Sequence, residues 1–305
     1  MVNNSQDNVM NKPNLFLIGA PKCGTTALAY NISHHKDVFL PIQKEPRFFD
    51  ASTFYDNPND YFTKTLEDYL NYYDNTEAKE SKYRLDASVF NMYKKESIEN
   101  ILVLSPDAKF IIILRDPVEA SISMFHQRLS VVDTSMREIS EDFNECWELL
   151  EDRKKGQSYP QGCKNKFLFR YDLLYSYQDY VPYLQKRLAK NLFIGFYDEY
   201  KNNPEQFFQK LFHFLEIENM EIENKNVNKS MILRKSFLLN LLNRFAKNTV
   251  QIRKKLGLLG ILNIQKNLIS KYKQPINKEV KAKQKVYDFF KPTYDYLKSL
   301  QHDKD

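Results

Sequence analysis

Short runs of apolar residues mark the strands of a buried sheet. The clearest runs are Leu15 to Ile18, Lys109 to Leu114 and Asn191 to Phe196. Apolar runs of this length, without alternating polar residues, are typical of parallel strands that are covered on both faces. A further strand is predicted from Lys82 to Ser88, where it ends in a turn of small residues.

Segments with helical periodicity lie between these strands. Helices are predicted at Thr25 to Tyr30, Ile98 to Leu104, Tyr171 to Leu188 and Phe207 to Leu215. Strands that alternate with helices indicate an α/β fold, and we predict a three-layer α/β/α sandwich with a central parallel sheet. Near the end of the chain, basic amphipathic helices are predicted from Phe237 to Leu262 and from Val280 to Leu300.

The turn after the first strand is a candidate anion site. Gly19 and Gly24 bracket it, Lys22 lies inside it, and Thr25 and Thr26 begin the next helix. Backbone N–H groups converge in such a turn, and the helix dipole adds positive potential. We expect the threonine hydroxyls to cap free N–H groups of the helix. The turn should therefore bind a phosphate or a sulfate.

This turn has the glycine spacing of the G-x-x-x-x-G-K-[ST] phosphate loop but not its lysine position. Thr25 and Thr26 stand where the lysine and the magnesium-binding hydroxyl belong, and the lysine has moved into the loop at Lys22. A nucleotide kinase or another phosphate-loop NTPase is therefore an alternative hypothesis. The missing Gly-Lys-Ser/Thr sequence argues against it.

A second phosphate contact is predicted at the end of the strand from Lys109 to Leu114. Arg115 follows that strand, and Pro117 fits the first turn of the next helix. A guanidinium group can bind a phosphate through two hydrogen bonds. Ser123 lies two turns into the helix, and its hydroxyl would add a second donor.

Three motifs together resemble those of sulfotransferases that use 3′-phosphoadenosine 5′-phosphosulfate (PAPS) as donor. Residues 21–26, PKCGTT, resemble the family's 5′-phosphosulfate loop, and residues 110–123, FIIILRDPVEASIS, its 3′-phosphate strand and helix. Residues 44–49, KEPRFF, resemble the K-E-P-x-F-F segment of the branch that acts on carbohydrates, typified by the heparan sulfate sulfotransferases.

The resemblance implies roles for individual residues. Glu45 would be the general base, and Lys44 would orient it or bind the bridging oxygen. The donor would be bound by Lys22, Cys23, Gly24, Thr25, Thr26, Arg115 and Ser123, with Lys229 and Arg234 as further phosphate contacts from the late N-x-S…R-S segment. No metal is expected, because Lys22 and the helix N-terminus would neutralise the leaving phosphate.

Two further features of the family pattern are matched only partly. His126 follows Ser123 by three residues, whereas some carbohydrate enzymes have an active-site histidine four residues on. His126 is thus a catalytic candidate beside the alternative of a packed or capping histidine. Asp86, Ala87 and Ser88 resemble an acidic-x-Ser/Thr-Pro element near the donor, but Val89 replaces the proline, and Ala87 stands where several carbohydrate enzymes carry lysine.

Length and composition favour one domain in a reducing compartment. The 305 residues suit a single domain from residue 13 to 305, preceded by a disordered leader over residues 1–12 that lacks a hydrophobic signal core. Three cysteines without metal-ligand spacing argue against a disulfide framework and fit the cytoplasm. No apolar run reaches the roughly 20 residues of a membrane span.

Positive charge gathers in the last quarter of the chain. Residues 231–305 hold 17 Lys and Arg against 5 Asp and Glu, whereas residues 1–230 hold 28 against 34. This basic part would attract a nucleotide, a polyanionic acceptor or an acidic membrane surface, or would simply be the solvated face of helices. Nucleic-acid binding is disfavoured because no module for it is visible.

The sequence therefore predicts transfer of a sulfuryl group from PAPS to a hydroxyl or amine acceptor. A carbohydrate or glycolipid acceptor is favoured, while lipid, polyketide and peptide-tyrosine acceptors stay open. A non-catalytic protein of the same fold that binds PAPS is the second alternative. Oligomeric state cannot be read from the sequence.

Overall fold

Five parallel strands form the central sheet in the computed structural model, which describes residues 11–221, 231–233, 273–275 and 280–302. The strands of this sheet are β1 (Leu15–Gly19), β2 (Val38–Phe39), β3 (Tyr83–Asp86), β4 (Lys109–Leu114) and β5 (Leu192–Phe196). They lie in the order β2-β3-β1-β4-β5. Every residue of β1 is buried, as its uninterrupted apolar run predicts.

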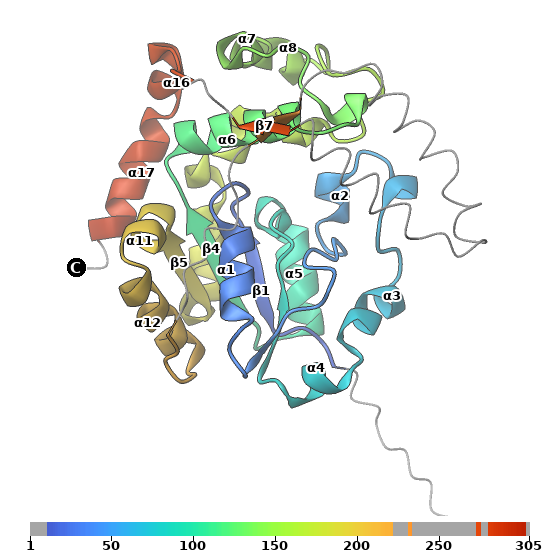
Figure 1. The fold of residues 1–305 in the computed structure, drawn as a ribbon, viewed down its shortest axis with the longest axis vertical. Coiled ribbons are helices and arrows are strands. Elements are labelled where there is room, and N and C mark those ends of the chain that lie inside the picture. Colours follow the sequence, from blue (N-terminus) through green and yellow to red (C-terminus); the bar gives the residue numbers. More distant parts are fainter. Residues whose placement is uncertain (1–10, 222–230, 234–272, 276–279, 303–305) are drawn as a thin grey trace, which may run out of the picture. The chain divides into compact units, whose positions relative to one another are not determined.

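Helices connect and flank the strands (Figure 1). The helices described are α1 (Thr25–Ile32), α2 (Ala51–Phe54), α3 (Leu66–Leu70), α4 (Thr76–Glu80), α5 (Lys95–Leu104), α6 (Pro117–Leu129), α7 (Phe143–Glu148), α8 (Leu150–Lys154), α9 (Tyr171–Leu174), α10 (Val181–Leu188), α11 (Tyr197–Asn202), α12 (Pro204–Leu215), α16 (Gln284–Phe289) and α17 (Lys291–His302).

The direction of the connections puts helices on both faces of the sheet. The chain runs from β1 through α1 toward β2 on one side, and from β3 through α5 past β1 to β4 on the other. Right-handed crossovers in opposite directions bring α1 and α5 to opposite faces. Asn31 of α1 donates to the Tyr200 hydroxyl of α11 at 2.9 Å, and Arg187 of α10 pairs with Glu99 of α5. The predicted three-layer α/β/α fold is confirmed.

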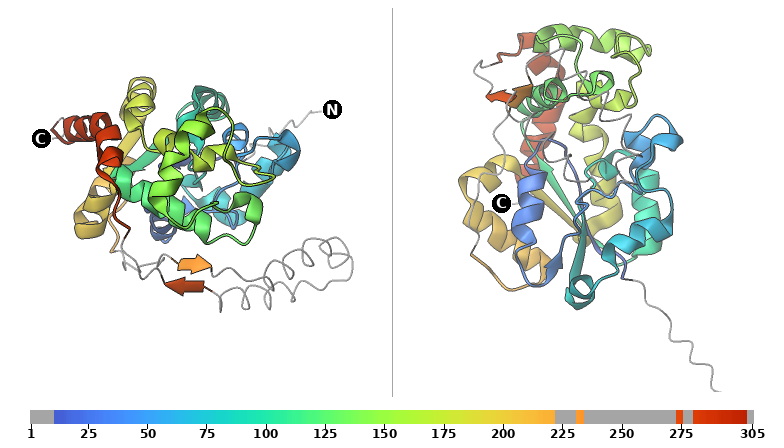
Figure 2. Two further views of the ribbon diagram at one scale, coloured as in Figure 1. Left: turned by 90° about the horizontal axis from the view of Figure 1, so that it is seen from above. Right: turned by 45° about the vertical axis from the view of Figure 1, so that its right-hand side comes forward.

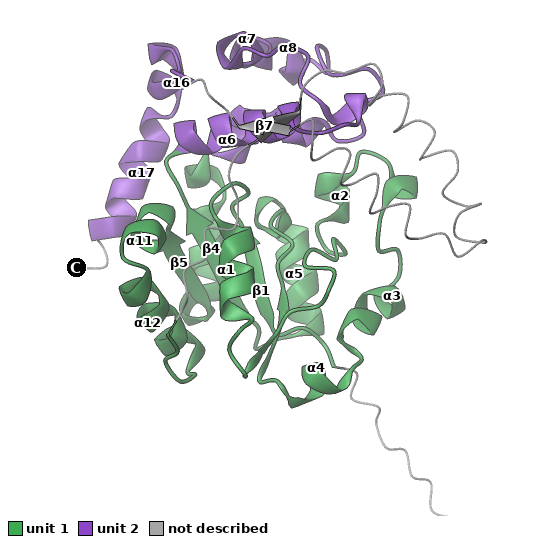
Figure 3. Cartoon of the chain, in the orientation of Figure 1, with its two compact units in different colours: residues 1–116, 176–227 green, residues 117–175, 228–305 purple. Residues whose placement is uncertain are grey.

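The chain divides into two compact units (Figure 3). The first, residues 1–116 with 176–227, holds the parallel sheet and its helices. The second, residues 117–175 with 228–305, holds α6 to α9, α16, α17 and two antiparallel strands, β6 (Met231–Leu233) and β7 (Lys273–Pro275) (Figure 2). One domain over residues 13–305 stays a prediction, and so does the leader over residues 1–12, whose first ten residues lie outside the described ones.

The prediction of one long helix from Tyr171 to Leu188 is wrong. The structure has α9, then a single 3-10 turn at Tyr177–Asp179, then α10 from Val181. Pro182 lies in the first turn of α10, where its missing N–H is harmless, but within a continuous helix it would remove a hydrogen bond. The predicted helix from Val280 to Leu300 is present as α16 and α17, and the one from Phe237 to Leu262 lies outside the described residues.

A buried ion pair holds the second unit together. Arg153 and Glu138 are both fully buried, and the guanidinium nitrogens donate to the two carboxylate oxygens at 2.9 and 2.7 Å. Arg153 also donates to the Phe169 carbonyl at 3.0 Å, and the Tyr171 hydroxyl donates to Glu138 at 2.5 Å. These contacts tie α8 and α9 to the segment before α7.

We expect Arg153→Met to lower the free energy of unfolding by about 3–5 kcal/mol, because it leaves the Glu138 carboxylate buried without its cation. Denaturant titration would measure the loss. Lys154→Met is the matched control, since its partner Glu151 lies at the surface and stability should stay near wild type. If the Arg153→Met protein were as stable as the Lys154→Met protein, the buried Arg153–Glu138 pair would not hold the second unit together.

Candidate active site

The predicted anion turn leads directly into α1. Gly24 is the residue before the helix and has φ 81°, a conformation that side chains rarely adopt. A Cβ atom on Gly24 would also lie 3.0 Å from the Tyr197 ring. The positive φ favours glycine at this position, and any other side chain would also crowd the Tyr197 ring.

The first turn of α1 carries no side-chain cap, so the expectation that threonine hydroxyls cap its N–H groups is wrong. The reason is that Gly24, which has no side chain to offer, occupies the capping position ahead of Thr25 and Thr26. The N–H groups at this helix end keep their capacity to bind an anion.

Arg115 reaches the anion turn from the end of β4. Its Nη1 donates to the Lys22 carbonyl at 3.2 Å, and its guanidinium carbon lies 4.4 Å from the centre of the Tyr197 ring. The predicted donor residues Lys22 and Arg115 thus come together in the first unit. Cys23 between them is fully buried, and burial raises the pKa of its thiol to about 12, against the influence of Tyr177, Arg115 and Lys22. The thiol is therefore a packed group and not a nucleophile.

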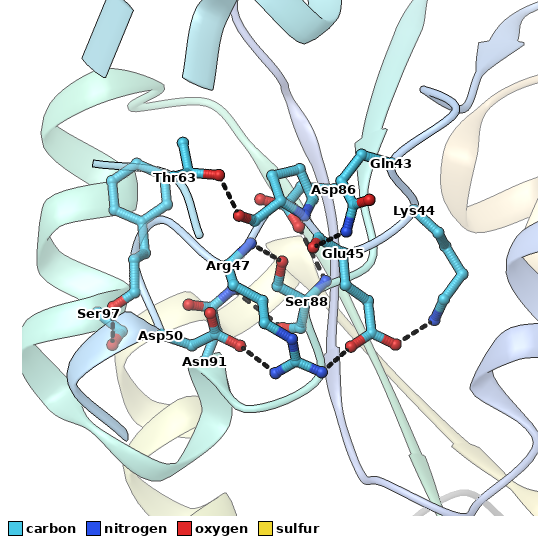
Figure 4. A network of polar contacts seen from close by, with 12 residues as sticks. Gln43, Lys44, Glu45, Arg47, Asp50, Thr63, Asp86, Ser88, Asn91 and Ser97 are labelled. Atoms are coloured by element: carbon cyan, nitrogen blue, oxygen red, sulfur yellow. Dashed lines mark hydrogen bonds and ion pairs between the residues drawn. The ribbon is translucent and has the colours of Figure 1, made fainter. Parts of the chain in front are cut away.

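Glu45 lies at the centre of a chain of charges (Figure 4). Lys44 Nζ is 2.7 Å from Glu45 Oε1, and Arg47 Nη2 pairs with the other carboxylate oxygen. On its far side, Arg47 Nη1 lies 3.6 Å from Asp50 Oδ2. The Glu45 side chain is 20% exposed and Asp50 is fully buried, so the network runs from a partly open end into the core.

The two carboxylates that share Arg47 have opposite pKa shifts. Burial alone would raise the pKa of Glu45, but Arg47 and Lys44 outweigh it and hold the pKa below the usual 4.5. Asp50 is more deeply buried, and burial raises its pKa to about 7 despite Arg47, with Asp86 and Glu45 adding to the rise. Glu45 is therefore ionised at neutral pH, which a general base must be.

The end of β3 fixes the loop that carries Glu45. The Ala87 N–H donates to the Lys44 carbonyl at 3.1 Å, and the Arg47 N–H donates to Ser88 Oγ at 3.1 Å. Ser88 N–H in turn donates to Asp86 Oδ1 at 2.8 Å. Arg47 has φ 54°, so these bonds stabilise a backbone conformation that is otherwise unfavourable.

These residues meet at one edge of the sheet. The Glu45 loop, the anion turn, Ser88 and Arg115 follow β2, β1, β3 and β4, respectively, and the carboxyl ends of parallel strands lie at the same edge. Ligands of open α/β sheets bind at this edge.

Other predicted residues are not joined to this site by the structure. Ser123 and His126 lie on α6 in the second unit, and their roles stay predictions. Lys229 and Arg234 lie outside the described residues. Within the described part of the chain, no cluster of His, Cys, Asp and Glu could hold a metal ion, and no helix is long and apolar enough to cross a membrane.

The family model of the sulfotransferase domain matches residues 12–291. The chain belongs to the sulfotransferase domain family. Over 114 residues it is 31% identical to the membrane-associated sulfotransferase kil1 of Dictyostelium discoideum, and the matched part is 37% of this chain and 22% of that protein. Over 122 residues it is 33% identical to human heparan sulfate glucosamine 3-O-sulfotransferase 3B1, and the matched part is 39% of this chain and 27% of that protein. The chain thus spans about a quarter of the length of these curated relatives.

A solved structure agrees with this membership at the level of the fold. The sulfotransferase from Alicyclobacillus acidocaldarius superimposes with a TM-score of 0.59 and 22% identity, covering 81% of this chain and 96% of that one. At this identity the likeness shows the fold alone.

Three residues of this sulfotransferase-family site were not assigned to the Glu45 network from the sequence. They are Arg47, Asp50 and, in its contact with the loop, Ser88. Arg47 occupies the variable position of K-E-P-x-F-F, and a second cation two residues after Glu45 was the available signal. The contact with Ser88 spans 41 residues, and no local pattern predicts it.

We expect Arg47→Gln to raise the pKa of Glu45, because burial then acts against Lys44 alone. Carbon NMR of labelled glutamate side chains would follow the titration, with Glu45→Gln to assign the signal. Arg187→Gln, which breaks a surface pair with Glu99, is the control and should leave the Glu45 signal unchanged. An unchanged Glu45 titration in Arg47→Gln would show that Arg47 does not set its charge.

Proposed function

We propose that this protein is a PAPS-dependent sulfotransferase that transfers a sulfuryl group to a hydroxyl or amine, on a carbohydrate or glycolipid. The observation that carries the proposal is the ionised Glu45, held by Lys44 and Arg47 at the same sheet edge as the Lys22–Arg115 anion turn. Family membership and the partial identity to a heparan sulfate sulfotransferase support it.

The residues of the anion turn fit a donor with two anionic ends. Lys22 and the uncapped N–H groups of α1 would bind the 5′-phosphosulfate, and Arg115 the 3′-phosphate. Negative charge grows on the bridging oxygen as the sulfur–oxygen bond to the donor breaks. Lys22 and the loop amides would stabilise that charge, as preorganised donors do in related transfers.

Glu45 would supply the second half of the reaction. The acceptor hydroxyl or amine attacks the sulfur, a new bond to sulfur forms, and 3′-phosphoadenosine 5′-phosphate (PAP) leaves with the electron pair. The attacking group becomes acidic as this bond forms, so an ionised carboxylate can take its proton. Lys44 and Arg47 would hold the carboxylate in position. Cytoplasmic localisation and action without a metal belong to the same proposal.

Nucleotide binding tests the donor site and the kinase alternative together. We expect PAP at 100 times its dissociation constant to stabilise the protein by about 2.7 kcal/mol. Adenosine 5′-phosphate, which lacks the 3′-phosphate, should stabilise it less at the same concentration, and Arg115→Ala should remove the difference. Thermal unfolding measures each case. Stabilisation by Mg-ATP alone would overturn the proposal in favour of a phosphate-loop NTPase.

Loss of the base should separate binding from chemistry. We expect Glu45→Gln to lower transfer of radiolabelled sulfate from PAPS by about 10²–10⁴-fold while PAP still stabilises the protein, because the amide cannot accept the proton. Lys22→Ala should lose transfer as well, through the lost stabilisation of the leaving group. A Glu45→Gln protein with wild-type turnover would exclude Glu45 as the base.

A further inference from the structure

Lys22 has a backbone conformation that usually belongs to glycine. Its φ is 66°, in the left-handed region that disfavours residues with a Cβ atom. Pro21 before it has its φ fixed at about −65° by its ring, and the Cys23 N–H donates to the Ala20 carbonyl at 3.4 Å. These are the features of a type II β-turn, whose third position prefers glycine. Contacts from outside the turn therefore have to keep Lys22 in this conformation.

The end of β4 supplies two such contacts. The Ala20 N–H donates to the Ile113 carbonyl at 2.9 Å, and Arg115 Nη1 donates to the Lys22 carbonyl at 3.2 Å. The C=O and N–H of a trans peptide group point in opposite directions. The peptide group after Lys22 is therefore held from both sides, at its oxygen by Arg115 and at its nitrogen by Ala20.

The Tyr197 ring holds the guanidinium group of Arg115 in turn. The guanidinium carbon lies 4.4 Å from the centre of this ring. The same ring packs so closely on Gly24 that a Cβ atom there would lie 3.0 Å away. Tyr197 thus contacts both the cation and the far end of the anion turn, and it restricts the position from which Arg115 donates.

One guanidinium group can bind the turn and a phosphate at the same time. It carries five N–H donors, so a bond to the Lys22 carbonyl does not prevent Arg115 from binding a phosphate through other donors. A phosphate bound to Arg115 would fix the guanidinium group and, through it, the Lys22 carbonyl. Such coupling is reciprocal, because a turn fixed by its own ligand would also fix Arg115 for the phosphate.

We propose that Arg115 is a positioning residue for Lys22 as well as a contact of the 3′-phosphate, so that the 3′-phosphate of the donor strengthens binding at the 5′-phosphosulfate turn. This inference rests on the proposed sulfotransferase function. It adds to that function a coupling between the two anionic ends of the donor.

Adenosine 5′-phosphosulfate (APS), the donor without its 3′-phosphate, isolates the positioning role. If Arg115 only contacted the 3′-phosphate, Arg115→Met would leave the affinity for APS unchanged. We expect about tenfold weaker APS binding by isothermal titration calorimetry, because the turn loses a charge-assisted hydrogen bond. Arg187→Met is the matched control, since Arg187 pairs with Glu99 at the surface of the same unit, and its APS affinity should equal wild type.

A double-mutant cycle separates positioning from the charge of Arg115 itself. Lys22→Met keeps the backbone and removes the ammonium group on which positioning acts. In this background we expect Arg115→Met to weaken APS binding by less than about twofold, because the two residues act as one unit. Equal losses in both backgrounds would overturn the proposal. Arg115→Gln passes through the same cycle, so that the result does not depend on the folding of one variant.

Binding of PAPS distinguishes failure of this inference from failure of the proposed function. If Arg115→Met weakens PAPS binding but leaves APS binding at the wild-type level, Arg115 contacts only the 3′-phosphate, and the positioning role alone is excluded. If the wild type binds neither PAPS nor APS, the proposed function fails, and the inference fails with it.

Discussion

The candidate active site depends on one arginine shared between a half-buried and a fully buried carboxylate. Arg47 pairs with Glu45 on one side and lies 3.6 Å from Asp50 on the other, while Phe54 and Phe90 hold its guanidinium group. One cation cannot compensate both carboxylates fully, and the depth of burial decides which carboxylate keeps its negative charge. Glu45, with Lys44 as a second partner, keeps a low pKa, and the pKa of fully buried Asp50 rises to about 7. The network thus leaves the charge on the carboxylate nearer the surface.

A chain of hydrogen bonds connects Arg47 to the hydrophobic core. Tyr69, fully buried, donates to Asp86 at 2.6 Å, Asp86 accepts from Ser88, and Ser88 accepts from the Arg47 N–H. Burial raises the pKa of Asp86, but the bonds from Ser88 and Tyr69 counter the rise. A core defect near Tyr69 would therefore be felt at Glu45, because each link fixes the position of the next.

Local patterns could predict the sheet but not the network. The apolar runs of β1 and β4 predict burial on both faces, and both strands are buried apart from Lys109. The run of β5 also became a strand, but its first three residues are half-buried because β5 lies at the edge of the sheet. The glycine turn and the K-E-P-x-F-F segment could likewise be recognised, because their functional residues are adjacent in the sequence. The pairing of Arg47 with Glu45 and Asp50 is local, but the motif leaves the position of Arg47 unspecified. The anchor at Ser88 joins residues far apart in the sequence, and the break before α10 depends on a proline's backbone, so motif spacing and helical periodicity missed both. The threonine-cap expectation failed because it overlooked that Gly24 takes the capping position.

The strand order gives the two halves of the proposed reaction separate sides of β1. Lys22 follows β1 itself, and Arg115 follows its neighbour β4, so donor contacts gather toward that side. The loop of Glu45 follows β2 and is anchored on β3, the neighbour of β1 on the opposite side. Lys22 and Arg115 then lie where an anionic leaving group would be bound, and the Glu45 carboxylate, paired with Lys44 and Arg47, lies where an acceptor would lose its proton. Because the leaving group and the base would then act from different sides of β1, the acceptor could approach the sulfur from the side opposite the breaking bond, which is the geometry of an in-line transfer.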